Sequence, residues 1–128
     1  MKTPTLPVPV ITAIAVIGAA IAFAAEETPI TKAMDLAHKA PKGEKKICEK
    51  IVDGTASEAE VKSTLDAYKA MADCKPPRGE QAAFKEKVAK LIGATEDVLA
   101  KKDGAAASYK AAVNCKACHS EHKPETKK

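Results

Sequence analysis

After the first 25 residues, apolar side chains recur every three or four positions, and no stretch alternates apolar with polar residues. Such spacing places apolar side chains on one face of an α-helix, whereas a half-buried strand would need alternation. The pattern therefore predicts an all-α chain with four helices. The first is expected from Ile30 to Gly54, and the second from Ser57 until just before Pro76. The third and fourth are expected from about Gln81 to Lys102 and from about Ala105 to His119.

Residues with special backbone preferences mark the ends of these helices. Ser57-Glu58-Ala59-Glu60 is a capping box, which opens a helix by satisfying its first free N–H groups. Gly54 suits the left-handed position just past a helix end, and Pro41 should kink or divide the first helix. Asp103-Gly104 turns the chain before the last helix. Because the connections are short, neighbouring helices should run antiparallel, as in an up-down-up-down four-helix bundle.

Large side chains are scarce for a domain of this size, since aromatic residues make up only 3% of the 128 and tryptophan is absent. A small core of this kind needs something else to complete it. The last expected helix is lined with alanine, with Tyr109 and Val113 as its only larger apolar residues. Such a helix leaves space, which predicts a bulky apolar group packed against it. The net charge of +4 gives no sign of dedicated nucleic-acid binding.

Residues 1–25 have the pattern of a secretory signal peptide. Met1-Lys2 provides a positive start, residues 8–25 form an apolar run, and Ala22-Phe23-Ala24 is an A-x-A cleavage site. The alternative is an uncleaved membrane anchor, because the run is nearly long enough to span a bilayer. We expect cleavage, a mature domain of residues 26–128, and export to a periplasm or an equivalent lumen without stable membrane insertion. Thiols in such a compartment tend to be oxidised or bound.

Cys115-Lys116-Ala117-Cys118-His119 is a C-x-x-C-H motif, the signature of covalent attachment of a c-type haem. Two thiols at this spacing can bond the two vinyl-derived carbons on one edge of a porphyrin, and His119 then ligates the iron. The alternatives are a redox disulfide and half of a zinc site. The redox motif of thioredoxin opens a helix after a strand, whereas this motif is expected to end a helix. A zinc site needs a second ligand pair, and only His122 is close. One covalent haem c is therefore the expected cofactor.

With this motif near its C-terminus, the mature chain resembles the class II c-type cytochromes, the group of cytochrome c′ and cytochrome c556. Within that group, AHK (37–39), KPPRGE (75–80) and NCKACHSEHK (114–123) resemble the small class II cytochromes of planctomycetes. The two extra cysteines make the chain similar to the heterodimeric cytochromes of anammox bacteria. The resemblance implies a haem with histidine and cysteine ligands, binding of NO and CO, and a homodimer or heterodimer. By the same resemblance, an anammoxosome-like lumen is one candidate for the exported compartment.

The sixth ligand of the iron decides between functions, since a strong ligand favours electron transfer and a weak or absent one favours gas binding. Helical rise along an antiparallel bundle places Cys74, Met34 and His38 near the level of His119, whereas Cys48 would lie about 13 Å away. We therefore predict a Cys74 thiolate as the sixth ligand, with Cys48, Met34, His38 and an open site as alternatives. The same spacing keeps Cys48 and Cys74 too far apart for a disulfide, which tolerates about 7 Å between Cα atoms.

Other polar residues support fewer roles. Arg78, in the loop at the expected haem end, is the candidate for binding a haem propionate. His122 is expected to be a solvated histidine of the C-terminal tail, and the lysines Lys42, Lys45, Lys46 and Lys123 are expected to be a solvated surface that could also meet an acidic partner. The sequence shows no nucleophile–base pair, phosphate loop or carboxylate dyad, so we do not expect an enzyme.

Two functions follow from these observations. The first is a haem protein that binds NO or CO as a sensor or carrier and gives up a displaceable ligand to do so. The alternative is a low-potential electron carrier that keeps both axial ligands and works with a redox partner protein.

Overall fold

The computed structural model describes residues 27–125 and confirms an all-helical fold, with no strand in that range. The signal peptide predicted for residues 1–25 lies outside the described residues. None of the described helices is long and apolar enough to cross a membrane. Six helices follow one another along the chain: α1 (Pro29–Ala37), α2 (Ile47–Asp53), α3 (Glu58–Ala72), α4 (Gln81–Leu99), α5 (Ala105–Ala112) and α6 (Cys115–His122).

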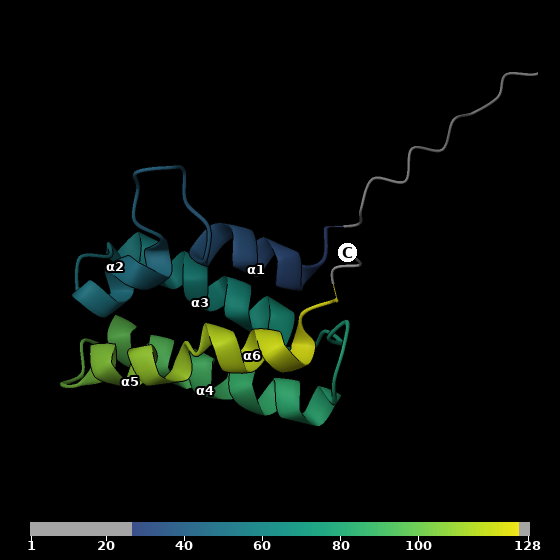
Figure 1. Ribbon diagram of the computed structural model, residues 1–128. Coiled ribbons are helices and arrows are strands. Elements are labelled where there is room, and N and C mark those ends of the chain that lie inside the picture. The colour runs from purple at the N-terminus through teal and green to yellow at the C-terminus, as the bar shows by residue number, and fades with distance from the viewer. Residues whose placement is uncertain (1–26, 126–128) are drawn as a thin grey trace, which may run out of the picture.

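The helices pack side by side around one core (Figure 1). The long helices α3 and α4 contact each other, α1 packs against α3, and α5 packs against α4. The short helix α2 contacts α5, α3 and α1, and α6 contacts α4. This arrangement is compatible with a helical bundle. The largest fully buried side chains at its centre are Tyr68, Tyr109, Ile51 and Val88.

The expected first helix is divided, as the position of Pro41 allowed. α1 ends at Ala37, and nine residues (38–46) follow before α2 begins at Ile47. Within them Gly43 has a φ of +94°, a left-handed conformation that breaks a helix. The backbone N–H of Lys46 then donates to the Glu49 carboxylate at 3.0 Å, which opens α2. Because of this break, α2 does not have to continue in the direction of α1. It packs against α5 as well as against α3.

The prediction of one last helix from Ala105 to His119 was wrong, because that segment is also divided. α5 ends at Ala112, and Asn114 caps a new helix by accepting a hydrogen bond from the Ala117 N–H at 3.0 Å. Asparagine competes with helix continuation by bonding to nearby backbone groups. The C-x-x-C-H motif therefore opens a helix and does not end one.

The predicted capping box and the predicted positions of Gly54 and Gly104 are confirmed, whereas α4 ends at Leu99 and not at Lys102. The Ser57 hydroxyl accepts from the Glu60 N–H at 3.2 Å, and the Glu60 carboxylate accepts from the Ser57 N–H at 2.8 Å. Gly54 and Gly104 both have a φ of +73° and lie at the end of α2 and the start of α5. These signals are local, and tertiary packing did not override them.

Candidate functional site

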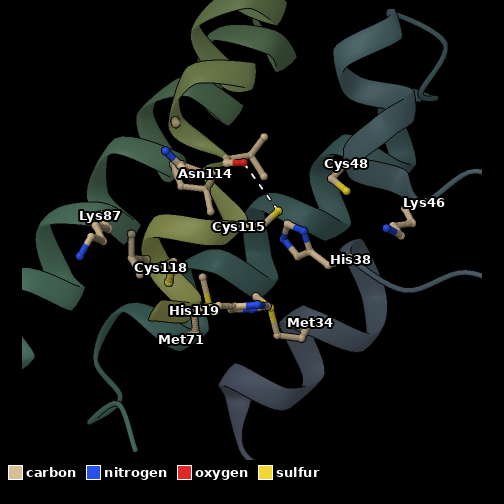
Figure 2. A pocket seen from close by; sticks show the side chains of 14 residues that line it. Met34, His38, Lys46, Cys48, Met71, Lys87, Asn114, Cys115, Cys118 and His119 are labelled. Carbon is tan, nitrogen blue, oxygen red and sulfur yellow. Dashed lines mark hydrogen bonds between the residues drawn. The ribbon is translucent and has the colours of Figure 1, made fainter. Parts of the chain in front are cut away.

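A cavity of about 210 Å³ lies between the helices, and each of the six helices contributes at least one residue to its lining (Figure 2). Most of the surface of the lining is apolar, although its residues include three thiols, two imidazoles, two lysines and an asparagine. Its residues are Met34, His38, Lys46, Cys48, Met71, Lys87, Val88, Leu91, Ala112, Val113, Asn114, Cys115, Cys118 and His119. The alanines of the last helix were expected to leave this space, and of these only Ala112 lines the cavity. The space therefore depends more on the two helix breaks than on small residues.

The attachment motif lies on the side of α6 that borders this cavity. Cys115 and Cys118 are three residues apart in the helix, and His119 is four residues after Cys115, so all three share one face. All three line the cavity, with Cys115 exposed and Cys118 partly buried. Two thiols and an imidazole are thus presented together at the edge of an apolar space.

The motif opens a helix, as a thioredoxin motif does, but no strand precedes it in the described part of the chain. The strand–helix setting of a thioredoxin motif is therefore missing from residues 27–125. All four cysteines of the structure are free thiols. Burial raises the pKa of the Cys118 thiol.

Three of the four candidates for the sixth ligand line the cavity, and Cys74 does not. Met34 comes from α1, His38 caps the end of α1, and Cys48 lies in the first turn of α2. Cys74 lies just past α3, where its Sγ is 3.7 Å from the Ala70 carbonyl oxygen. The structure therefore brings Cys48 to the motif and leaves Cys74 outside the cavity.

The sequence-based ranking of these ligands assumed straight helices. It counted residues along one axis from the turn near Gly54, which places Cys48 far from His119. The division after Ala37 frees α2 from that axis, and Cys48 then reaches the cavity with only 8% of its surface exposed. Burial raises the pKa of the Cys48 thiol, so ionisation of this group needs a compensating positive partner.

A chain of hydrogen bonds leads from the core to the cavity, and sequence reasoning missed it. The Tyr68 hydroxyl lies 2.8 Å from the Tyr109 hydroxyl and 2.9 Å from Nε2 of His38. Both tyrosines are fully buried. Burial, followed by the nearby His119 and Lys46, lowers the pKa of His38 to about 4, so its imidazole is neutral at pH 7. The available signal was that the chain has only two tyrosines and that each lies on an apolar helix face.

These two tyrosines give a pH dependence of stability. Burial raises the pKa of Tyr109 to about 12 and that of Tyr68 further. Their neutral forms are favoured in the folded state, so this contribution is complete below the unfolded pKa of about 10. We expect the free energy of unfolding to fall above pH ~10, by about 1.4 kcal/mol per pH unit for each tyrosine. Denaturant unfolding at several alkaline pH values measures the slope, and Tyr109→Phe should lower it by the contribution of one tyrosine. A slope equal in both proteins would contradict the assignment.

Arg78 does not line the cavity, so the structure does not bring the predicted propionate ligand to it. Its guanidinium instead donates to the Ser120 carbonyl oxygen and pairs with Glu125 at 3.0 Å. Lys46 does line the cavity and is therefore a cation available to an acidic group there. The acidic side chain nearest to its amine is that of Glu49, at 3.7 Å. Lys87 also lines the cavity and pairs with Glu121.

The prediction that His122 is a solvated tail residue was wrong, because only 4% of its surface is exposed. α6 continues through His122, whose Nδ1–H donates to the Arg78 carbonyl oxygen at 3.0 Å. Its ring packs edge-on against Phe84 with centroids 5.3 Å apart. A Cβ added to Gly79 would lie 2.8 Å from its Nδ1. His122 therefore anchors the C-terminal end of α6 to the loop between α3 and α4.

The donor set fits a haem better than a bare metal ion. The described residues hold no group of three or more His, Cys, Asp or Glu side chains able to bind an ion together. A tetrahedral structural zinc site draws all four ligands from the protein, whereas a haem iron needs only axial ligands because the porphyrin supplies the rest. Two thiols and one imidazole on a single helix face, beside an apolar cavity, meet that smaller requirement.

No family model, curated protein or solved structure gives a significant match to this chain.

Proposed function

We propose that this chain is a c-type cytochrome with a single covalent haem. The observation that carries the proposal is the placement of Cys115, Cys118 and His119 on one face of α6, at the edge of an apolar cavity. The two thiols would bond the haem edge and His119 would ligate its iron. The haem would supply a redox-active iron with affinity for diatomic gases.

The helix order supports the class II cytochrome architecture as part of this proposal. In an antiparallel four-helix bundle, α1 and α2 together would form the first helix, α3 the second, α4 the third, and α5 and α6 together the fourth. The motif lies in the last of them, as in the class II group that the sequence resembles. By the same resemblance, the chain would be exported and would form a dimer with itself or with a related chain.

Cys48 is our candidate for the sixth ligand, in place of Cys74. Its thiol is buried in the lining of the cavity, while Cys74 lies outside. The raised pKa of Cys48 disfavours a free thiolate, and a ferric iron is the positive partner that would offset that cost. His38 is a weaker candidate because its Nε2 already bonds the Tyr68 hydroxyl. Met34 remains the alternative on α1.

A thiolate would bind ferric iron strongly but ferrous iron more weakly, so Cys48 would be displaceable in the reduced protein, and this supports gas binding as the function. Reduction of the iron weakens its attraction for a thiolate, so CO or NO would compete for the same position. No carboxylate is among the residues that line the cavity, so His38 has no acidic partner there for acid–base catalysis. We therefore propose a binding protein and not an enzyme.

Absorption spectra of the purified protein test the proposal. A haem that resists acid–acetone extraction, together with a mass increase of one haem on the chain, would support covalent attachment. A CO adduct of the reduced protein would support gas binding. A haem protein whose reduced spectrum does not change under CO would instead be an electron carrier, and a chain purified without haem would overturn the assignment.

A further inference from the structure

Tyr68 connects the buried centre of the fold to the cavity. Its hydroxyl has two hydrogen-bond partners among the described residues, the Tyr109 hydroxyl at 2.8 Å and Nε2 of His38 at 2.9 Å. Tyr68 and Tyr109 have no exposed surface, and His38 lines the cavity beside the motif (Figure 2).

The positions of the protons in this chain follow from counting donors and acceptors. The two hydroxyl groups carry two protons, and each needs an acceptor because an unpaired buried donor costs free energy. The only acceptors that the described contacts provide are the other hydroxyl oxygen and Nε2 of His38. If Nε2 carried a proton, one hydroxyl proton would have no acceptor. Tyr109 therefore donates to Tyr68, and Tyr68 donates to Nε2.

This direction fixes the form of the imidazole. Neutral histidine carries one ring proton, so an Nε2 that accepts leaves the proton on Nδ1. Nδ1 has no hydrogen-bond partner among residues 27–125, and the ring borders the cavity. The Tyr68 hydroxyl thus holds an N–H donor of His38 at the edge of the space where the motif residues lie.

We propose that the Nδ1–H group of His38 donates a hydrogen bond to a small diatomic ligand held in the cavity. The inference rests on the proposed function and adds a residue that selects among ligands. A donor stabilises ligands whose outer atom carries partial negative charge, and an apolar group in its place would not. His38 contacts the ligand in this proposal, while Tyr68 acts on it only by fixing the ring, as a positioning residue.

Infrared spectroscopy of the reduced protein under CO provides the test, since the C–O stretch falls in frequency when a donor approaches the oxygen. We expect a lower stretch in the wild type than in His38→Leu, and CO dissociation about five-fold faster in the variant, as for the loss of one hydrogen bond. Tyr68→Phe releases Nε2 and should shift the stretch partly towards that of His38→Leu.

Tyr109→Phe is the matched control. It also removes a buried hydroxyl, but Tyr68 still needs Nε2 as its acceptor, so both the stretch and the dissociation rate should stay near wild type. Nitrogen-15 NMR of the reduced CO-bound protein gives a readout independent of ligand affinity. The His38 signals should show Nδ1 protonated and Nε2 unprotonated in the wild type and Tyr109→Phe, and a mixture of both forms in Tyr68→Phe.

The outcomes separate this inference from the proposed function. If CO binds but its stretch and dissociation rate are the same in the wild type and His38→Leu, the inference fails and the cytochrome assignment stands. A wild-type His38 protonated on Nε2 would also overturn it. If the purified chain carries no haem or the reduced haem takes up no CO, the gas-binding function fails and this role of His38 fails with it.

Discussion

Replacing Cys48 with alanine is expected to change the ferric haem spectrum from low-spin to high-spin and to raise the reduction potential. The structure places this thiol in the lining of the cavity that the attachment motif borders. A thiolate ligand is strong and negatively charged, so it favours both the low-spin state and ferric iron. Its loss should leave the iron with His119 as its one strong protein ligand.

Cys74→Ala is the matched control for this experiment. The two variants remove the same group, but Cys74 lies outside the cavity with its Sγ near the Ala70 carbonyl oxygen. We expect its spectrum and potential to match wild type. The opposite pattern, a high-spin Cys74→Ala and an unchanged Cys48→Ala, would restore the ligand inferred from helical rise and refute the one inferred from the cavity. Circular dichroism of both variants checks that the helices remain folded.

Gly79→Ala is expected to destabilise the protein by about 2–4 kcal/mol. Gly79 has a φ of +81°, where any side chain is strained. An added Cβ would also lie 2.8 Å from Nδ1 of His122 and 2.9 Å from the Glu121 carbonyl oxygen. The C-terminal end of α6 would have to move away, and the hydrogen bond from His122 to the Arg78 carbonyl oxygen would be lost with it.

Gly43→Ala separates the two parts of that cost. Gly43 also has a positive φ, +94°, but nothing lies within 4 Å of an added Cβ. It should therefore show only the backbone strain, about 1 kcal/mol. Denaturant unfolding of both variants gives the comparison. Equal losses would mean that the close approach to His122 has no energetic consequence, and His122→Ala would then also have little effect.

The features that the sequence predicted correctly depend on neighbours along the chain. The capping box at Ser57, the left-handed glycine at Gly54 and the division near Pro41 follow from local backbone chemistry, and all three are present. The spacing of Cys115, Cys118 and His119 was equally visible. Their shared helix face follows from it, while attachment of a haem stays a prediction.

The features that the sequence did not predict depend on distances across the fold. Cys74 was ranked above Cys48 by counting residues along straight helices. The division of the first helix invalidates that count, and the sequence does not give the new position of α2. His122 is buried because the loop around Arg78 reaches the end of α6. Arg78 and His122 are 44 positions apart in the sequence. The link between His38 and Tyr68 spans 30 positions in the same way. No local pattern encodes contacts of this range.

The break at Asn114 has a consequence for the order in which the protein is assembled. An eight-residue helix is too short to be stable by itself, so α6 keeps its shape through the Asn114 cap and the contacts of His122, Lys87 and Arg78 near its far end. We therefore expect α6 to open more easily than the longer helices, because few contacts hold it. Under the proposed function, the open segment would present Cys115 and Cys118 to a porphyrin and then close onto the core as the last step of maturation.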